Sequence, residues 1–251
     1  MEELLRVARA SPLTGLIERH LPAGGALLEA GCGLGQYVLL LRERGRAALG
    51  ADWSLEALRA GARLGAPLAV MDLRSLAVRT GALAAYLSLG VVEHDPDGPD
   101  AILREAARVL PRGGALLLSV PYWNGVRRLA APYLRRQGRR TRAAGGQFYQ
   151  YAFTRAELGR LLDAQGFTVT GFHPYDPARV LRATWRGLRP GRGGPAAPAP
   201  GPRSAGPSPS PPGPAPGRGR SRLRGAARAL LYSEPSLRLL GHMLLAVAVR
   251  R

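Results

Sequence analysis

The chain of 251 residues contains no lysine and only one cysteine, Cys32. A single cysteine excludes an intramolecular disulfide and any zinc site built from several thiolates. No apolar run approaches the roughly 18 residues that cross a bilayer, and the opening stretch MEELLRVARA lacks the apolar core of a secretory signal. These absences predict a protein of a reducing, cytoplasmic compartment that holds no metal.

Acidic residues are scarce in the second half of the chain. All 36 basic side chains are arginine, and the formal net charge is +19. Residues 1–110 hold 12 arginines and 13 acids, whereas residues 111–251 hold 24 arginines and only four acids. GC-rich codon usage explains arginine in place of lysine but leaves the missing acids unexplained. The second half is therefore predicted to lie near something anionic, or to tolerate it.

Short apolar runs alternate with helical periodicity between residues 25 and 120, a pattern typical of βα units around a parallel sheet. Strands are expected at GALLEAG, RAALGAD, APLAVMD, ALAAYLSLG and ALLLSVPYW. Residues 1–22 form an amphipathic helical segment ahead of them. Later, TRAELGRLLDAQGF has the capping residues of a helix, and FTVTGFHPYD and HMLLAVAVR have the composition of strands.

Half of the 22 prolines fall within residues 190–220. This Pro/Gly/Ser-rich stretch is predicted to be disordered. The apolar run that follows it needs a sheet to join. We therefore predict one domain made of residues 1–189 and 222–251, interrupted by an insertion at 190–221.

A glycine-rich turn follows the first expected strand, in LLEAGCGLGQY, with the glycines Gly31, Gly33 and Gly35. Glycines at a strand-to-helix turn let the backbone bend tightly and come close to a ligand. Three acids, Glu29, Asp52 and Asp72, stand at the expected carboxyl ends of neighbouring strands. Together these residues predict a crevice for a ligand that offers ribose and amine donors.

The stretches LLEAGCGLGQY, LGADWS, AVMDLRSL, LSLGVVEH and RVLPRGGALLLSVP resemble the successive motifs of class I S-adenosylmethionine-dependent methyltransferases of the type 11 kind. The resemblance covers residues 25–180 and takes 240–250 as a seventh strand. It implies a Rossmann-like α/β sheet in the order 3-2-1-4-5-7-6, with strand 7 antiparallel and helices on both faces. The implied cofactor is S-adenosyl-L-methionine.

Carried over residue by residue, the resemblance implies a complete cofactor site. Around the methionine part it places Glu29, Gly31, Cys32, Gly33 and Gly35. The ribose and adenine would be bound by Asp52, Trp53, Asp72 and Leu73. The loop over the donor methyl would be formed by Leu89 and Gly90.

Methyl transfer to a hydroxyl benefits from a general base near neutral pKa. His94, beside Glu93, is the candidate for this role. The alternative is that the two residues only cap and orient the loop. The acceptor is expected to be a small molecule, or a sugar- or lipid-linked compound, methylated at oxygen.

Residues 121–150 form the arginine-rich segment that covers the substrate in such folds. The residues expected to contact the acceptor are Tyr122, Trp123, Asn124, Arg127, Arg128, Tyr149 and Tyr151. Three interpretations of the arginines stay open. They clamp an anionic acceptor, they lie peripherally on the acidic inner membrane face, or they form a solvated charged face.

Two alternative functions also stay open. An RNA methyltransferase would interleave basic residues with stacking aromatics, and such motifs are missing. Its binding would weaken steeply with ionic strength. The other alternative is a protein of methyltransferase-like fold that binds without turnover. The sequence carries no indication of an oligomeric state.

Overall fold

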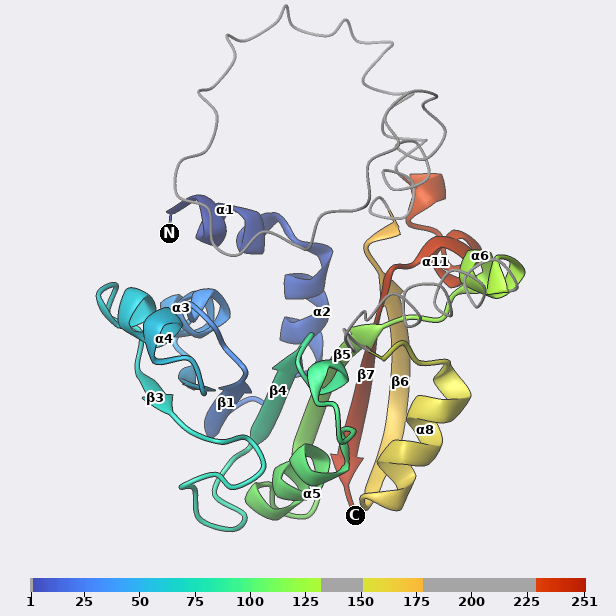
Figure 1. The fold of residues 1–251 in the computed structure, drawn as a ribbon. Helices are drawn as coiled ribbons and strands as arrows, with labels where there is room; N and C mark the ends of the chain where they lie inside the picture. Colours follow the sequence, from blue (N-terminus) through green and yellow to red (C-terminus); the bar gives the residue numbers. More distant parts are fainter. Residues whose placement is uncertain (1, 132–150, 178–228) are drawn as a thin grey trace, which may run out of the picture.

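Seven strands form one sheet in the order β3-β2-β1-β4-β5-β7-β6 (Figure 1). The computed structural model describes residues 2–131, 151–177 and 229–251. The strands are β1 (Ala26–Ala30), β2 (Ala47–Asp52), β3 (Leu68–Val70), β4 (Ala85–Leu89), β5 (Ala115–Pro121), β6 (Phe167–Tyr175) and β7 (Met243–Arg250). Only β7 runs antiparallel to its neighbours, β5 and β6. The predicted α/β order and the orientation of the last strand are confirmed.

The central strands are apolar on both sides because helices cover both faces of the sheet. The helices are α1 (Glu2–Ala10), α2 (Pro12–His20), α3 (Gln36–Glu43), α4 (Leu55–Ala62), the 3-10 turn η1 (Val92–His94), α5 (Asp100–Val109), α6 (Gly125–Leu129), α8 (Arg155–Ala164) and α11 (Glu234–Leu240). On one face α2, α3 and α4 pack on the core through Ile17, Val38 and Leu58. On the other face α5 and α8 pack on it through Leu103 and Leu158.

The last strand returns to the sheet after the segment that lies outside the described residues. Along β7, Leu245 pairs with Ser119 of β5 and with His173 of β6. Just before β7, α11 lies beside α6, although the two are far apart in sequence (Figure 1). The predicted insertion at 190–221, and most of the cap predicted at 121–150, lie outside the described residues. The domain boundaries stay a prediction.

The third strand is shorter than the sequence predicted. It ends at Val70, so Asp72 lies two residues beyond it. Asp72 instead opens a turn, in which the Ser75 amide donates to the Asp72 carbonyl at 3.0 Å. An edge strand with a single partner, β2, has fewer backbone bonds to extend it. Among the described helices, none has the length and apolar character that crossing a membrane requires.

Candidate cofactor and acceptor site

The glycine turn joins β1 to α3 in a conformation that favours glycine. Gly31, Gly33 and Gly35 have φ angles of 77°, 53° and 73°. The Gly31 and Cys32 amides both donate to the Ala51 carbonyl of β2, at 2.7 and 3.1 Å. The tight bend that the glycines predicted is present, and these two bonds fasten it to the end of the neighbouring strand.

Two of these glycines differ in the space around them. A Cβ added at Gly31 would lie 2.7 Å from Val91 Cγ1, whereas one at Gly33 would have nothing within 4 Å. A positive φ alone costs a non-glycine residue about 1–2 kcal/mol. Overpacking adds about 1–3 kcal/mol. We expect Gly33→Ala to lower the free energy of unfolding by about 1–2 kcal/mol, and Gly31→Ala by about 2–5 kcal/mol.

Urea unfolding of the two variants and the wild type measures this difference. Gly33→Ala is the matched control, because it carries the same change of backbone preference without the contact to Val91. Equal losses in the two variants would show that the Val91 contact relaxes at no cost.

Glu29 caps the helix that follows the glycine turn. Its side chain is 4% exposed, and its Oε2 accepts a hydrogen bond from the Val38 amide at 3.1 Å. The N-cap residue of α3, Gly35, has no side chain to do so. Burial raises the pKa of Glu29 to about 8, and the nearby Asp52 adds to the shift. A cation beside this carboxyl would favour its ionised form, so Glu29 fits the ammonium of an amino-acid moiety.

Asp52, at the end of β2, is 7% exposed. Its Oδ2 accepts from the Gly33 amide at 2.8 Å, and its Oδ1 accepts from the Ser54 amide at 2.9 Å. Each carboxylate oxygen has two lone pairs, so each can accept one further donor. The next residue, Trp53, is 84% exposed and offers an apolar ring beside the carboxylate. The two residues therefore fit a nucleoside, whose ribose diol and base need these two partners.

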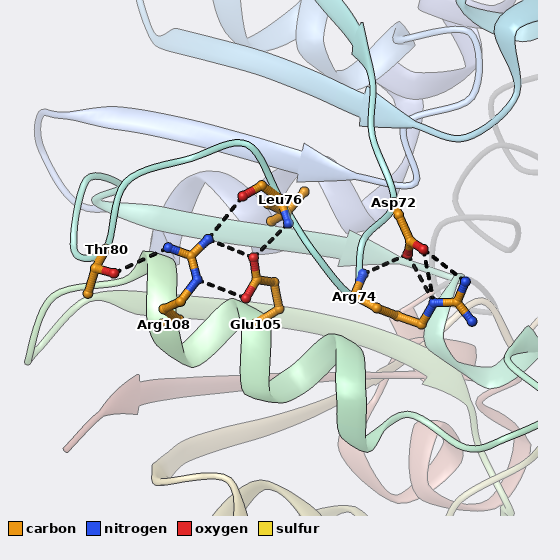
Figure 2. Close-up of polar contacts among 6 residues, drawn as sticks. All are labelled: Asp72, Arg74, Leu76, Thr80, Glu105 and Arg108. Atoms are coloured by element: carbon orange, nitrogen blue, oxygen red, sulfur yellow. Dashed lines mark hydrogen bonds and ion pairs between the residues drawn. The ribbon is translucent and has the colours of Figure 1, made fainter.

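Asp72 already has a cationic partner. Arg74 Nη2 donates to Asp72 Oδ2 at 2.8 Å, and the Arg74 amide donates to Oδ1 at 2.9 Å (Figure 2). These bonds to Arg74 hold the pKa of the half-exposed Asp72 below its usual range. Leu73 between them is buried. Contact of Asp72 and Leu73 with adenine stays a prediction, and an adenine amine would share the carboxylate with Arg74.

A clamp from α5 fixes the loop that carries these residues. Glu105 Oε1 accepts from the Leu76 amide at 2.6 Å, and Arg108 Nη2 donates to the Leu76 carbonyl at 3.0 Å (Figure 2). Arg108 Nη1 also reaches Thr80 Oγ1 at 3.2 Å. This clamp is not among the features predicted from the sequence. Its only local signal is an acid three residues before an arginine on one helix face.

In the loop after β4, the Glu93 side chain is buried in the protein interior. Glu93 is 2% exposed, and its Oε2 has no hydrogen-bond partner within the described part of the chain. A Cβ added at Gly90 would lie 3.6 Å from Glu93 Oε1, so the carboxyl lies against Gly90. Burial raises the pKa of Glu93 to about 7. His94 is exposed, and its charge favours the ionised form of Glu93.

Leu89 and Gly90 stand where the predicted methyl-donor loop begins. Gly90 has a φ of 79°, and its amide donates to the Ser119 carbonyl of β5 at 2.9 Å. The Tyr151 amide donates to the Glu93 carbonyl at 2.9 Å, and the Tyr151 hydroxyl donates to the Pro96 carbonyl at 3.1 Å. The structure therefore brings the predicted residue Tyr151 against the loop that holds Glu93.

Other residues predicted to contact the acceptor hold α6 in place. Asn124 is fully buried and is the N-cap of α6, with its Oδ1 accepting from the Arg127 amide at 2.8 Å. Its Nδ2 donates to the Gly241 carbonyl at 2.7 Å. Arg127 Nη1 donates to the Tyr122 carbonyl at 2.7 Å. The side-chain bonds of Asn124 and Arg127 thus join α6 to the segments around it.

For Trp123 and Arg128, two further residues predicted to contact the acceptor, the structure gives fewer contacts. The Trp123 amide donates to the Phe153 carbonyl at 2.8 Å; Trp123 is half-buried, and Arg128 is exposed. Tyr149 lies outside the described residues. The role of all seven residues toward an acceptor stays a prediction.

A family model described as a methyltransferase domain matches residues 4–171. No curated protein matches. A solved S-adenosylmethionine-dependent methyltransferase from Methanosarcina mazei is 22% identical with a TM-score of 0.56, covering 64% of this chain and 88% of its own.

Two further solved structures cover nearly the whole chain. Geranyl diphosphate C-methyltransferase from Streptomyces coelicolor, solved with Mg²⁺, geranyl diphosphate and S-adenosylhomocysteine, is 16% identical with a TM-score of 0.58, covering 98% of this chain and 81% of its own. A possible histamine N-methyltransferase from Thermotoga maritima is 16% identical with a TM-score of 0.56, covering 99% and 91%. At such identities these likenesses concern the fold.

The family model spans more than half of the chain, from α1 to β6. The sheet order, the glycine turn and the buried acids of β1 and β2 agree with it. The chain therefore belongs to the class I methyltransferases and uses S-adenosyl-L-methionine as its cofactor.

Proposed function

We propose that this methyltransferase acts on a hydroxyl oxygen of a small-molecule, sugar- or lipid-linked acceptor. The observation that carries the proposal is the Glu93 carboxyl, buried against Gly90 with one unpaired oxygen. A hydroxyl is a poor nucleophile until its proton is removed, and a base with a pKa near 7 removes it well at neutral pH. A neutral amine or an activated carbon needs this assistance less.

The residues of the site divide the work between binding and proton transfer. The bound cofactor supplies a methyl group on a positively charged sulfur, which is already reactive. Asp52 and Trp53 hold the nucleoside, and Glu29 faces the amino-acid part. The bond from Gly90 to Ser119 fixes the loop beside the donor methyl. Glu93 accepts the proton of the acceptor hydroxyl, while the bonds of Tyr151 to the Glu93 and Pro96 carbonyls hold the loop in place.

His94 has a supporting role in this scheme. Its charge favours the ionised form of Glu93, which is the form that accepts a proton. Because its own side chain is exposed, we assign the base to Glu93 and the electrostatic tuning to His94. This division keeps both residues of the predicted pair in the site.

A small-molecule acceptor is supported by the neighbours. The Streptomyces coelicolor enzyme is solved with geranyl diphosphate, an anionic small molecule. Arg128, exposed on α6, is one residue that we propose for an anionic acceptor. The arginines of the cap beyond residue 131 lie outside the described residues.

Methyl transfer from labelled cofactor to matched hydroxyl, amine and RNA acceptors tests the proposal. We expect label on oxygen, located in the product by mass spectrometry and NMR. A product methylated at nitrogen or carbon contradicts the proposal. Label found only in RNA, with a yield that falls steeply as salt rises, identifies the RNA alternative. Cofactor binding in calorimetry without any product identifies a binding protein.

A further inference from the structure

Three adjoining cavities lie beneath the turn between α1 and α2. Their volumes are about 330, 650 and 510 Å³, and all three are lined by Pro12 and Tyr232. The smallest lies between α2, β6 and the start of α11, and we call it the α2–β6 pocket. No local sequence pattern indicates these cavities, because their walls come from segments far apart in the chain.

A pair of hydroxyls connects the α2–β6 pocket to the methyl-donor loop. Tyr175 lines the pocket, and its hydroxyl lies 2.6 Å from Ser119 Oγ. Ser119 is fully buried, and its carbonyl accepts from the Gly90 amide at 2.9 Å. One side chain therefore separates the cavity from the strand that fixes Gly90.

The residue after Tyr175 has an unusual backbone. Asp176 has a φ of 52°, the only positive value outside glycine in the described residues. Such strain is concentrated at binding sites. Asp176 also lines the cavity next to the α2–β6 pocket.

The walls of the α2–β6 pocket are mainly apolar. Leu16, Phe172, Pro174 and Leu237 line it, together with the ring of Tyr175. At about 330 Å³ it lies near the lower limit of the roughly 300–1,000 Å³ that small-molecule sites occupy. This volume suits a small ring system or a short chain and is too small for a peptide helix.

Among the charged residues that line the α2–β6 pocket, Glu234 has an ion-pair partner, whereas Arg19 has none in the described part of the chain. Glu234 lines the pocket but pairs with Arg238 at 3.0 Å. Arg19 also lines it, and no carboxylate in the described part of the chain forms an ion pair with Arg19. The arginines of the neighbouring cavities do have such partners: Arg6 pairs with Glu3, Arg9 with Glu43 and Arg44 with Glu18.

The groups around His173 also make this wall positive. His20 of α2 lies against His173, with ring centroids 4.7 Å apart. Burial, followed by the charges of His20, Arg19 and Arg155, lowers the pKa of His173, and only Glu234 opposes them. An anionic group entering at Arg19 would therefore meet a favourable field.

We propose that the α2–β6 pocket binds the apolar body of the methyl acceptor, with an acidic group of that acceptor paired to Arg19. This inference rests on the proposed function and extends it, because it selects amphiphilic anions from the wider class of small acceptors. Carboxylates and phosphates share the chemistry that Arg19 would recognise.

Two fluorescent probes test the pocket without knowledge of the acceptor. The first, 8-anilinonaphthalene-1-sulfonate, combines an apolar ring system with an anion. The second, N-phenyl-1-naphthylamine, has the same rings and no charge. We expect both to bind the wild-type protein at one site. Arg19→Gln should weaken the sulfonate about fivefold and leave the neutral probe unchanged. Leu237→Glu should weaken both.

Arg104→Gln is the matched control, since Arg104 is an exposed arginine of α5, on the opposite face of the sheet. Circular dichroism and thermal melts confirm that each variant is folded, because the sulfonate also binds partly unfolded chains. Probe affinities that are the same in the wild type, Arg19→Gln and Leu237→Glu overturn the inference.

Failure of the pocket and failure of the proposed function give different results. Calorimetry with S-adenosylhomocysteine and the position of the transferred methyl report on the function. If the methyl group is found on oxygen but the probe affinities do not change in Arg19→Gln and Leu237→Glu, only the proposed role of the pocket is contradicted. If the probes bind as expected but the methyl group is found on nitrogen, only the proposed hydroxyl acceptor is contradicted.

Discussion

Asp52→Ala should weaken cofactor binding by at least about 100-fold, because each charged hydrogen bond contributes about 1.5–3 kcal/mol. The Asp52 carboxylate lies where two strand ends meet, and its oxygens hold the Gly33 and Ser54 amides. Each oxygen keeps one further lone pair, to which we expect the ribose diol to donate. The substitution removes both expected hydrogen bonds to the ribose hydroxyls. It also removes the acceptor of the Gly33 amide in the glycine turn. The free energy of unfolding should fall by about 1–3 kcal/mol, since two amides lose their acceptor.

Calorimetry with S-adenosylhomocysteine measures the loss of affinity, and circular dichroism verifies the fold. Asp163→Ala is the matched control, because Asp163 is exposed on α8 and its side chain forms an ion pair with Arg251, far from the glycine turn in the sequence. Asp52→Asn should lie between the two, since an amide keeps one acceptor oxygen. An affinity of Asp52→Ala within about threefold of the wild type would mean that the ribose is held elsewhere.

The glycine turn and the strand end at Asp52 are predicted well from the sequence because their signals are local. Gly31, Gly33 and Gly35 adopt backbone angles that other residues avoid, so the need for glycine is visible in the sequence itself. Asp52 ends a strand, and strand ends converge at one edge of a parallel sheet. The order of the sheet, including the antiparallel last strand, came from the resemblance to class I methyltransferases and not from periodicity.

Other parts of the site depend on contacts that leave no local pattern. Ser119 and Tyr175 are 56 positions apart, and Asn124 reaches Gly241 across 117 positions. These hydrogen bonds form only when the folded sheet brings the residues together, so neither periodicity nor spacing in the sequence predicts them. Asp72 shows a local failure instead. Its turn with Arg74 and Ser75 replaces the strand end that the apolar run suggested.

Glu93→Gln should lower kcat by about 100- to 1,000-fold, the usual contribution of a general base. In the wild type, activity should rise with pH through the pKa of about 7, since only the ionised carboxylate accepts a proton. That inflection should be absent from the residual activity of the variant. Initial rates at saturating cofactor between about pH 5 and about pH 9, two units below and above this pKa, measure both effects.

The same substitution should make the protein more stable in alkaline solution. The pKa of Glu93 in the folded state, about 7, lies above its ordinary value of 4.5, so its contribution to stability is complete below pH 4.5 and declines up to pH 7. A shift of this size corresponds to about 3 kcal/mol. The neutral glutamine avoids this penalty, although its buried amide recovers only part of it. We expect the free energy of unfolding of Glu93→Gln at pH 8 to exceed that of the wild type by about 1 kcal/mol.

Glu157→Gln provides the opposite case. Glu157 belongs to the capping box of α8, and its hydrogen bonds to Thr154 hold its pKa below the ordinary value. Its stabilising contribution is present above pH 4.5 and is lost in acid, so this variant should be slightly less stable at pH 8 and fully active. A buried acid that is kept at a cost in stability needs a function to explain it. If Glu93→Gln gains stability but keeps kcat, the carboxyl is not the base, and the acceptor must lose its proton by another route.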